Sequence, residues 1–262
     1  MNIPEDVLKE FPDLRDRAFE DRRSKIQESI DKNMVATLFP IIQIHIEEGA
    51  PSKGILKFIE AHSIDLLMMG RHRDFRGHGV LSSRLARRAT CSLFIVPQDA
   101  ESNPDHFLIP CDFSKYSKLA MQTGKELAQR YGSSKVVCQN VFSVPASWYY
   151  SGKTYEEFAQ IMKENAQKAF KKFMKDIDQK GINVEDVYSL DKDDNPVNDI
   201  TSYMTETNPG CVIIGAKGRT ATTALFIGSK AEHFVQENTK TPMLLVRPKG
   251  KNEGIIDLIK QI

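Results

Sequence analysis

Two stretches of the sequence decide the fold: GAPSKGILKFIEAHSIDLLMMG at residues 49–70 and DNPVNDITSYMTETNPGCVIIG at residues 194–215. They align without a gap, and each has apolar residues three and four positions apart, followed by a short apolar run that ends in glycine. This pattern predicts a helix and then a buried strand. The two copies agree again at residues 93–96 and 243–246. A match in one element order over this length indicates two homologous halves.

The second half is a complete alternation of strands and helices. Expected strands are 106–110, 135–142, 184–190, 211–215 and one from Met243. Expected helices are 118–131, 155–178, the helix of the repeat, and 229–237. Buried strands that alternate with helices form right-handed βαβ units and a mostly parallel sheet. We therefore expect an α/β protein with two homologous, open, Rossmann-like parallel sheets.

The first half lacks its opening strand–helix–strand. A helix expected at about 7–30 matches the long helix of the second half, so the counterparts of the earlier elements fall before Met1. Either the chain is a truncated form, or this half borrows sheet from a partner. We favour truncation, because a parallel sheet without its central strands leaves apolar strands unpaired.

The halves meet at a polar segment bounded by prolines. We expect a partial, degenerate domain at 1–98, a linker at 99–104, a complete domain at 105–249 and a tail at 250–262. The tail is apolar and short with little positive charge, so we expect it to pack on the protein's own sheet or on a dimer mate and not on a membrane.

Composition excludes several classes of protein. Of 262 residues 40% are hydrophobic, which excludes global disorder, and the net charge of +1 provides no field to attract nucleic acid. No run of about 18 apolar residues is present, and the first residues lack a signal-peptide pattern. The four cysteines have neither disulfide-framework nor zinc-site spacing, so we expect a cytoplasmic protein.

Three stretches of the second half reach the carboxyl edge of the predicted sheet, where such folds bind ligands. The stretch from Gly215 to Lys230 predicts phosphate binding. Gly215 and Gly218 let the backbone turn and present N–H groups, and Gly228 and Ser229 stand where a helix begins. Nearby positive charge comes from Lys217, Arg219 and Lys230.

The spacing Gly-x-x-Gly-x9-Gly-Ser from residue 215 resembles the nucleotide-binding motif of the universal stress protein family. PCDFSKYSKLA at 110–120 looks like the family's opening strand and turn, and DLLMMG at 65–70 like its fourth strand. Asn140-Val141 stands where the family usually has His-Val. The resemblance covers the chain as a tandem pair. It implies the adenine nucleotide alpha hydrolase-like fold and ATP as ligand, with Mg²⁺ as an accompanying ion.

The resemblance also implies which residues bind. Asp112 and Val141 would contact adenosine, beside a wall formed by Pro110 and Cys111. The glycines with Ser229 would hold ribose and phosphates. The complete expected set is Pro110, Cys111, Asp112, Val141, Ile214, Gly215, Gly218, Arg219, Gly228, Ser229 and Lys230.

The first half departs from the nucleotide motif. Arg73 replaces the second glycine, and Val80 follows Gly79 where a hydroxyl residue is expected. We therefore expect ATP in the second half only, with the first half a structural copy. No catalytic triad, P-loop or carboxylate cage is evident, so we expect a stress-response regulator and not an enzyme, although slow ATP hydrolysis stays open.

Two alternatives stay open. One is a ligand-free interaction scaffold that uses a basic cluster in the first half, Arg71, His72, Arg73, Arg76, His78, Arg84, Arg87 and Arg88. The other is a nucleotide hydrolase. We expect no DNA or RNA partner, because no aromatic platform beyond Phe75 accompanies the cluster. A homodimer or pairing of the two halves within one chain is expected, with a protein partner still unidentified.

Overall fold

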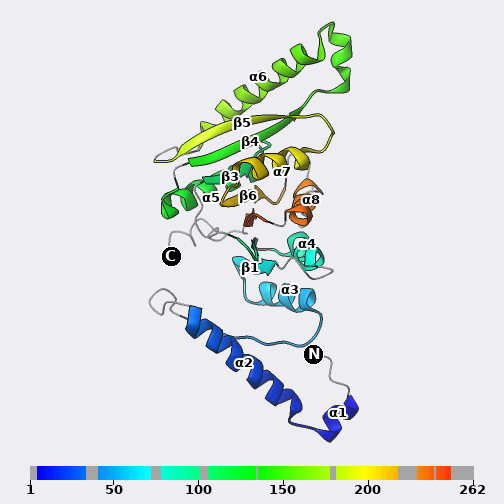
Figure 1. The fold of residues 1–262 in the computed structure, drawn as a ribbon, viewed down its shortest axis with the longest axis vertical. Coiled ribbons are helices and arrows are strands. Elements are labelled where there is room, and N and C mark those ends of the chain that lie inside the picture. Colours follow the sequence, from blue (N-terminus) through cyan, green and yellow to red (C-terminus); the bar gives the residue numbers. More distant parts are fainter. Residues whose placement is uncertain are drawn as a thin grey trace. The chain divides into compact units, whose positions relative to one another are not determined.

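The structure is a computed structural model that describes residues 5–33, 41–71, 78–100, 106–133, 135–177, 181–217, 229–238 and 240–248 (Figure 1). The chain divides into two compact units between Phe58 and Ile59. The first unit contains α1 (Glu5–Glu10), α2 (Leu14–Asn33) and the start of α3 (Pro51–Ala61).

The second unit is built on one seven-stranded sheet with the order β1-β2-β7-β6-β3-β4-β5 (Figure 1). Its strands are β1 (Leu66–Arg71), β2 (Ser92–Pro97), β3 (His106–Pro110), β4 (Lys135–Ser143), β5 (Asn183–Asp191), β6 (Cys211–Gly215) and β7 (Met243–Val246). Its helices are α4 (His78–Arg88), α5 (Lys115–Tyr131), the 3-10 helix η1 (Ala146–Ser151), α6 (Tyr155–Met174), α7 (Pro196–Thr207) and α8 (Ser229–Glu237).

The expected α/β fold is confirmed, and the two halves share a single sheet. Every strand pair is parallel except β2 with β7, which run antiparallel with Phe94 opposite Leu244. These are the corresponding last strands of the two repeats. Among the described strands, the first half contributes β1 and β2, and the second half contributes the other five.

Charged side chains also join the two halves. The Arg71 guanidinium at the end of β1 donates to the carbonyls of Val235, Gln236 and Asn238 at 2.7–2.8 Å. The last carbonyls of a helix have no partners within the helix, so Arg71 caps α8 and favours its negative dipole end. Arg87 of α4 pairs with Glu232 of α8, and these two helices pack on each other.

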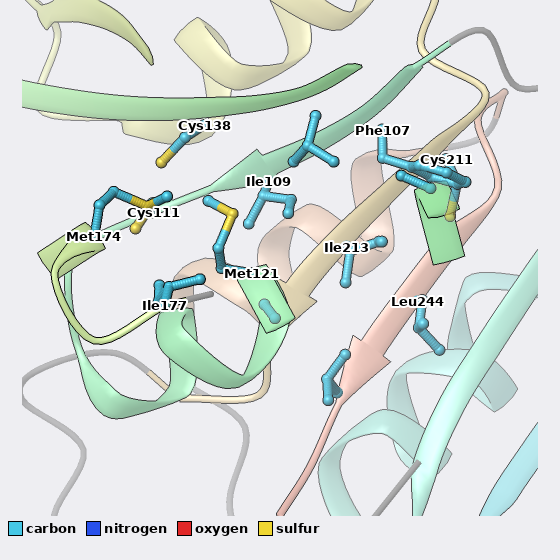
Figure 2. Packing of buried hydrophobic residues seen from close by; sticks show 14 residues of the cluster. Phe107, Ile109, Cys111, Met121, Cys138, Met174, Ile177, Cys211, Ile213 and Leu244 are labelled. Carbon is cyan, nitrogen blue, oxygen red and sulfur yellow. The ribbon is translucent and has the colours of Figure 1, made fainter. Parts of the chain in front are cut away.

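The core lies between the sheet and the helices α5 and α6. Figure 2 shows Ile109, Met121 and Ile213 packed together inside it. α5 approaches the sheet so closely that a Cβ on Gly124 would lie 2.5 Å from Cδ1 of Ile109. A larger residue at this position would require the Ile109 side chain to shift.

Local structure departs from the sequence prediction in four places. The opening helix is broken at Phe11–Asp13, since Pro12 lacks the N–H that would continue it. α5 starts at Lys115, three residues early, because the Ser114 hydroxyl caps it by accepting from the Ser117 N–H. α6 ends at Met174, four residues short of the predicted end, and η1 is an unpredicted element.

One apolar segment of the first unit is left without a strand partner. Residues 41–46, IIQIHI, alternate like a strand and align with the end of β5, yet they form neither helix nor strand, and Ile41 is 79% exposed. β5 is held by β4.

We expect Arg71→Gln to lower the free energy of unfolding by about 2 kcal/mol, since hydrogen bonds from a charged donor to the α8 carbonyls are lost. Arg84→Gln on the exposed face of α4 is the control, with an expected change within about 0.5 kcal/mol. Urea unfolding followed by circular dichroism measures both. Equal effects of the two substitutions would contradict the capping role of Arg71.

Burial raises the pKa of the Cys211 thiol from 9.0 to about 12. Because folding raises this pKa, the stability that the neutral thiol contributes is complete below pH 9 and is lost as the pH rises toward 12. Between these values we expect the free energy of unfolding to fall more steeply with pH in the wild type than in Cys211→Ala, by up to about 1.4 kcal/mol per pH unit. Urea titrations from pH 8 upward test this, and parallel curves would refute it.

Candidate functional site

The candidate site lies at the carboxyl edge of the sheet between β3 and β6. The chain leaves β3 toward β4 on one side, and β6 flanks β3 on the other, so the strand order reverses here. Such a switch point opens a crevice beyond the strand ends. The pairings of Pro110 with Gln139 and of Leu108 with Val212 bring Cys111, Asn140 and Gly215 to nearly the same level.

Asp112 is held in a tight turn directly after β3. Its Oδ1 accepts from the Ser117 hydroxyl at 2.6 Å and from the Ser114 N–H at 3.0 Å. The Asp112 N–H donates to the Ser117 hydroxyl oxygen at 3.1 Å. Both serines belong to the start of α5, so Asp112 is fixed to the helix that follows it.

Phe113 gives this turn its shape. It has φ = 62°, a left-handed conformation that bulky residues rarely adopt. Its ring packs on Phe173 and Phe170 of α6, with centroids 5.6 and 6.5 Å apart. This packing offsets the backbone strain, so the position of Asp112 is determined by a contact with a distant helix.

Asn140 has a structural role beside the site. Its Nδ2 donates to the Cys111 carbonyl at 2.7 Å, and the side chain is buried. The Cys111 N–H in turn donates to the Gln139 carbonyl at 2.8 Å. Asn140, which replaces the histidine of the resembling motif, therefore fixes the backbone that leads to Asp112. Val141 beside it is half-buried.

Gly215 is required by a close approach of the backbone. A Cβ there would lie 2.7 Å from the Tyr116 carbonyl oxygen, which belongs to the first turn of α5. The predicted reason, a sharp phosphate-binding turn, is therefore not what the structure shows at this position, since Gly215 is the last residue of a regular strand. At the corresponding Gly70 of the first half a Cβ would meet nothing within 4 Å.

Lys217 is a buried cation at this edge. Only 5% of it is exposed, and its Nζ lies 5.9 Å from the centroid of the Tyr116 ring. Among the residues that the structure describes, no carboxylate pairs with it. A ring face attracts a cation, and Lys217 brings a positive charge to this edge of the sheet. The site is thus suited to a negatively charged ligand.

The remaining predicted residues are described in part or not at all. α8 begins at Ser229, as predicted, but the side chains of Ser229 and Lys230 lie outside the described residues, as do Gly218, Arg219 and Gly228. Pro110, Cys111, Asp112, Val141, Ile214 and Gly215 come to one edge of the sheet. The sequence did not predict the roles of Phe113 and Tyr116, since no local pattern indicates a contact with a distant helix or strand.

Thiol chemistry is suppressed around this edge. All four cysteines are buried and unbridged. The neighbouring Cys111 and burial together raise the pKa of Cys138 well above its ordinary value.

In the described part of the chain no three His, Cys, Asp or Glu side chains gather as metal ligands would. No described helix has the length and apolarity to cross a bilayer.

The basic cluster of the first half is partly used for structure. Arg71 caps α8 and Arg87 pairs with Glu232, so these two guanidinium groups hold the halves together. Arg84 and Arg88 are exposed on α4. His72, Arg73 and Arg76, and the side chain of His78, lie outside the described residues.

The sequence matches the universal stress protein family over residues 3–97 and 104–247. The chain belongs to this family and carries two copies of its domain. A universal stress protein of Methanocaldococcus jannaschii is 23% identical over 144 residues, which are 55% of this chain and 82% of that protein.

Solved structures support the same fold. A universal stress protein from Archaeoglobus fulgidus superposes with a TM-score of 0.62 at 17% identity, over 96% of this chain and 82% of that one. A protein of unknown function from Pseudomonas aeruginosa gives a TM-score of 0.57 at 11% identity, over 94% and 81% of the two chains. At these identities the likeness concerns the fold alone.

We expect Gly215→Ala to destabilise the protein by about 1–3 kcal/mol, because the new Cβ collides with the Tyr116 backbone, which cannot move without α5. Gly70→Ala is the matched control in the other half and should change stability by less than about 0.5 kcal/mol. Thermal unfolding of both variants measures the difference. If both tolerate alanine equally, the close approach at Gly215 does not constrain the fold.

Proposed function

We propose that the protein is a regulatory universal stress protein that binds ATP in its second half only. The observation that carries the proposal is that Lys217 follows β6 and the fixed Asp112 carboxylate follows β3, two neighbouring strands whose carboxyl ends lie at one edge of the sheet. A lysine suits phosphates and a carboxylate suits hydroxyl or amine donors, and a nucleotide offers both kinds of group.

In this proposal the adenosine part contacts Asp112 and Val141, beside Pro110 and Cys111. The triphosphate is held by the N–H groups of Gly218, Gly228 and Ser229, close to Lys217. α8 supports this assignment because its first residue is Ser229, and free N–H groups and the positive dipole end meet at a helix start.

The first half is not expected to bind nucleotide. Val80 follows Gly79 where the motif has a hydroxyl residue. Arg73 also replaces the second glycine of the motif. In the proposal this half is a structural copy that widens the sheet through β2 and β7.

No catalytic step is assigned to the site. Asp112 is the carboxylate described at this edge, and its Oδ1 is engaged by Ser114 and Ser117. The described residues thus offer no cage for Mg²⁺, and an ion there would depend on the phosphates themselves. We propose that ATP acts as a signal in the cytoplasm by changing the surface offered by residues 218–228 to a protein partner.

We expect the purified protein, once denatured, to release ATP or AMP that mass spectrometry detects. Gly218→Val should release at least tenfold less, because a side chain is placed in the proposed phosphate path. Gly70→Val is the matched control in the first half, where the added side chain meets open space, and should release as much as the wild type.

An empty wild type that also shows no thermal shift at millimolar ATP would refute the proposal. Release from both glycine variants would place the nucleotide elsewhere in the chain. A partner that still binds Gly218→Val but not Arg73→Glu would favour the ligand-free scaffold, which the structure supports less because Arg71 and Arg87 are engaged within the chain.

A further inference from the structure

A groove lies between α6 and the carboxyl-terminal parts of β4 and β5. Figure 1 shows α6 lying along these two strands, on which it packs. The volume of the groove is about 370 Å³, which is within the range of small-molecule sites. None of the residues that line it belongs to the proposed nucleotide site. The groove is thus a second candidate binding site, built from different residues.

The floor of the groove is apolar. Tyr188 and Leu190 are two residues apart on β5, so their side chains leave the same face of the sheet. Phe142 of β4 is paired with Leu190 and lines the groove from that face as well. Across from them stands Ala159 of α6, whose small side chain fills little of the space. The floor thus suits a flat apolar body, since aromatic rings pack well edge-to-face or offset on one another.

Tyr155 lines the groove at the start of α6, and its position is fixed. Its ring lies 5.7 Å from that of Trp148 in η1, edge to face at 83°. A capping box holds the helix start. The Thr154 hydroxyl accepts from the Glu157 N–H at 3.1 Å, and the Glu157 carboxylate accepts from the Thr154 N–H at 2.8 Å. This part of the aromatic lining is therefore arranged before a ligand arrives, which lowers the cost of binding.

The direction of α6 places Lys163 at the opposite end of the groove. β4 and β5 are parallel and α6 connects them, so the helix runs opposite to the strands. Lys163 lines the groove about two turns after Tyr155, which is about 12 Å along the helix. It therefore lies toward Tyr188, which comes first among the lining residues of β5. Lys192, which follows β5, lies toward Tyr155.

Lys163 is suited to hold an anion at its end of the groove. It is half-buried, and among the residues that the structure describes no carboxylate pairs with it. The adjacent Glu164 accepts a hydrogen bond from Gln160 at 3.1 Å. Asp186 lies near the Tyr188 hydroxyl, whose pKa is raised by burial and by this carboxylate. Both neighbouring acidic groups thus act on other side chains.

Lys192 is less suited to this role. It is exposed, and Glu156 lines the same end of the groove, so a negative charge stands beside it. A charge that is partly removed from water interacts more strongly than an exposed one. The anion position therefore falls at Lys163, and the apolar position falls toward Phe142 and Tyr155.

We propose that the groove binds a small carboxylic acid with an aromatic body. The ring packs on Phe142 and Tyr155 across from Ala159, and the Lys163 ammonium holds the carboxylate. The apolar floor supplies most of the affinity, and the charge-assisted contact supplies the preference for an acid. Binding here requires neither ATP nor residues 218–228, so it goes beyond the proposed nucleotide function and is independent of it.

The test uses phenylbutanoate as the probe, with the uncharged phenylbutanol and the cationic phenylbutylamine as matched compounds. Trp148 is the one tryptophan of the chain, and its ring packs on Tyr155, so its fluorescence reports on the groove. Isothermal titration calorimetry of the same samples records binding that leaves this fluorescence unchanged. We expect saturable binding of phenylbutanoate and at least tenfold weaker binding of the other two compounds.

Four variants locate the site. Lys163→Gln removes the charge and should weaken phenylbutanoate at least tenfold while phenylbutanol is unaffected. Lys172→Gln, at an exposed position of the same helix, is the matched control and should bind like the wild type. Ala159→Phe fills the groove and should abolish binding with an unchanged circular dichroism spectrum. Gly218→Val, the nucleotide-site variant, should bind phenylbutanoate with the affinity of the wild type.

A wild type that shows no saturable binding at millimolar phenylbutanoate would overturn the proposal. Equal affinity for phenylbutanol or phenylbutylamine would refute the role of Lys163 and with it the class of ligand. Equal affinity of Lys163→Gln and Lys172→Gln would place the probe elsewhere on the protein. Loss of the probe in Gly218→Val would place it at the nucleotide site, which refutes this proposal and leaves the ATP proposal standing.

Discussion

The antiparallel pairing of β2 with β7 is the contact on which the rest of the structure depends. The strands described in the first half are β1 and β2, and two parallel strands do not form a stable sheet alone. β7 gives β2 a hydrogen-bonded neighbour on its second side, which also holds β1 in place. Arg71 then closes the contact, because its guanidinium binds the carbonyls at the end of α8.

The two halves also differ at the carboxyl ends of their strands. In the second half the ends of β3, β4 and β6 meet beside the start of α5, which builds a turn around Asp112 and leaves room only for glycine at position 215. In the first half a Cβ on the corresponding Gly70 would meet nothing within 4 Å. One repeat brings Asp112 and Lys217 to the edge of the sheet, and the other contributes the strands β1 and β2.

Much of this architecture was predictable from local pattern. The repeat, the order of helices and strands and most of their ends follow from apolar periodicity, since each element must bury one face. The edge of the sheet that carries Pro110, Cys111, Asp112, Val141 and Gly215 was also predictable, because the carboxyl ends of parallel strands share one edge. The break in the opening helix could also be predicted from Pro12, although the apolar periodicity of residues 7–30 alone does not show it.

The sequence by itself therefore determined the fold class, the family and the half in which a nucleotide site is proposed, because these depend on neighbours in the chain. Only the tertiary structure decided how the halves join, what Asn140 and Gly215 do, and why Phe113 adopts its left-handed backbone. The physical reason is that each of these depends on a group far away in the sequence: β7, the Cys111 carbonyl, the Tyr116 backbone or the rings of α6. Residue type shows that a polar group needs a partner or that a glycine allows close contact, but the partner is known only once the chain has folded.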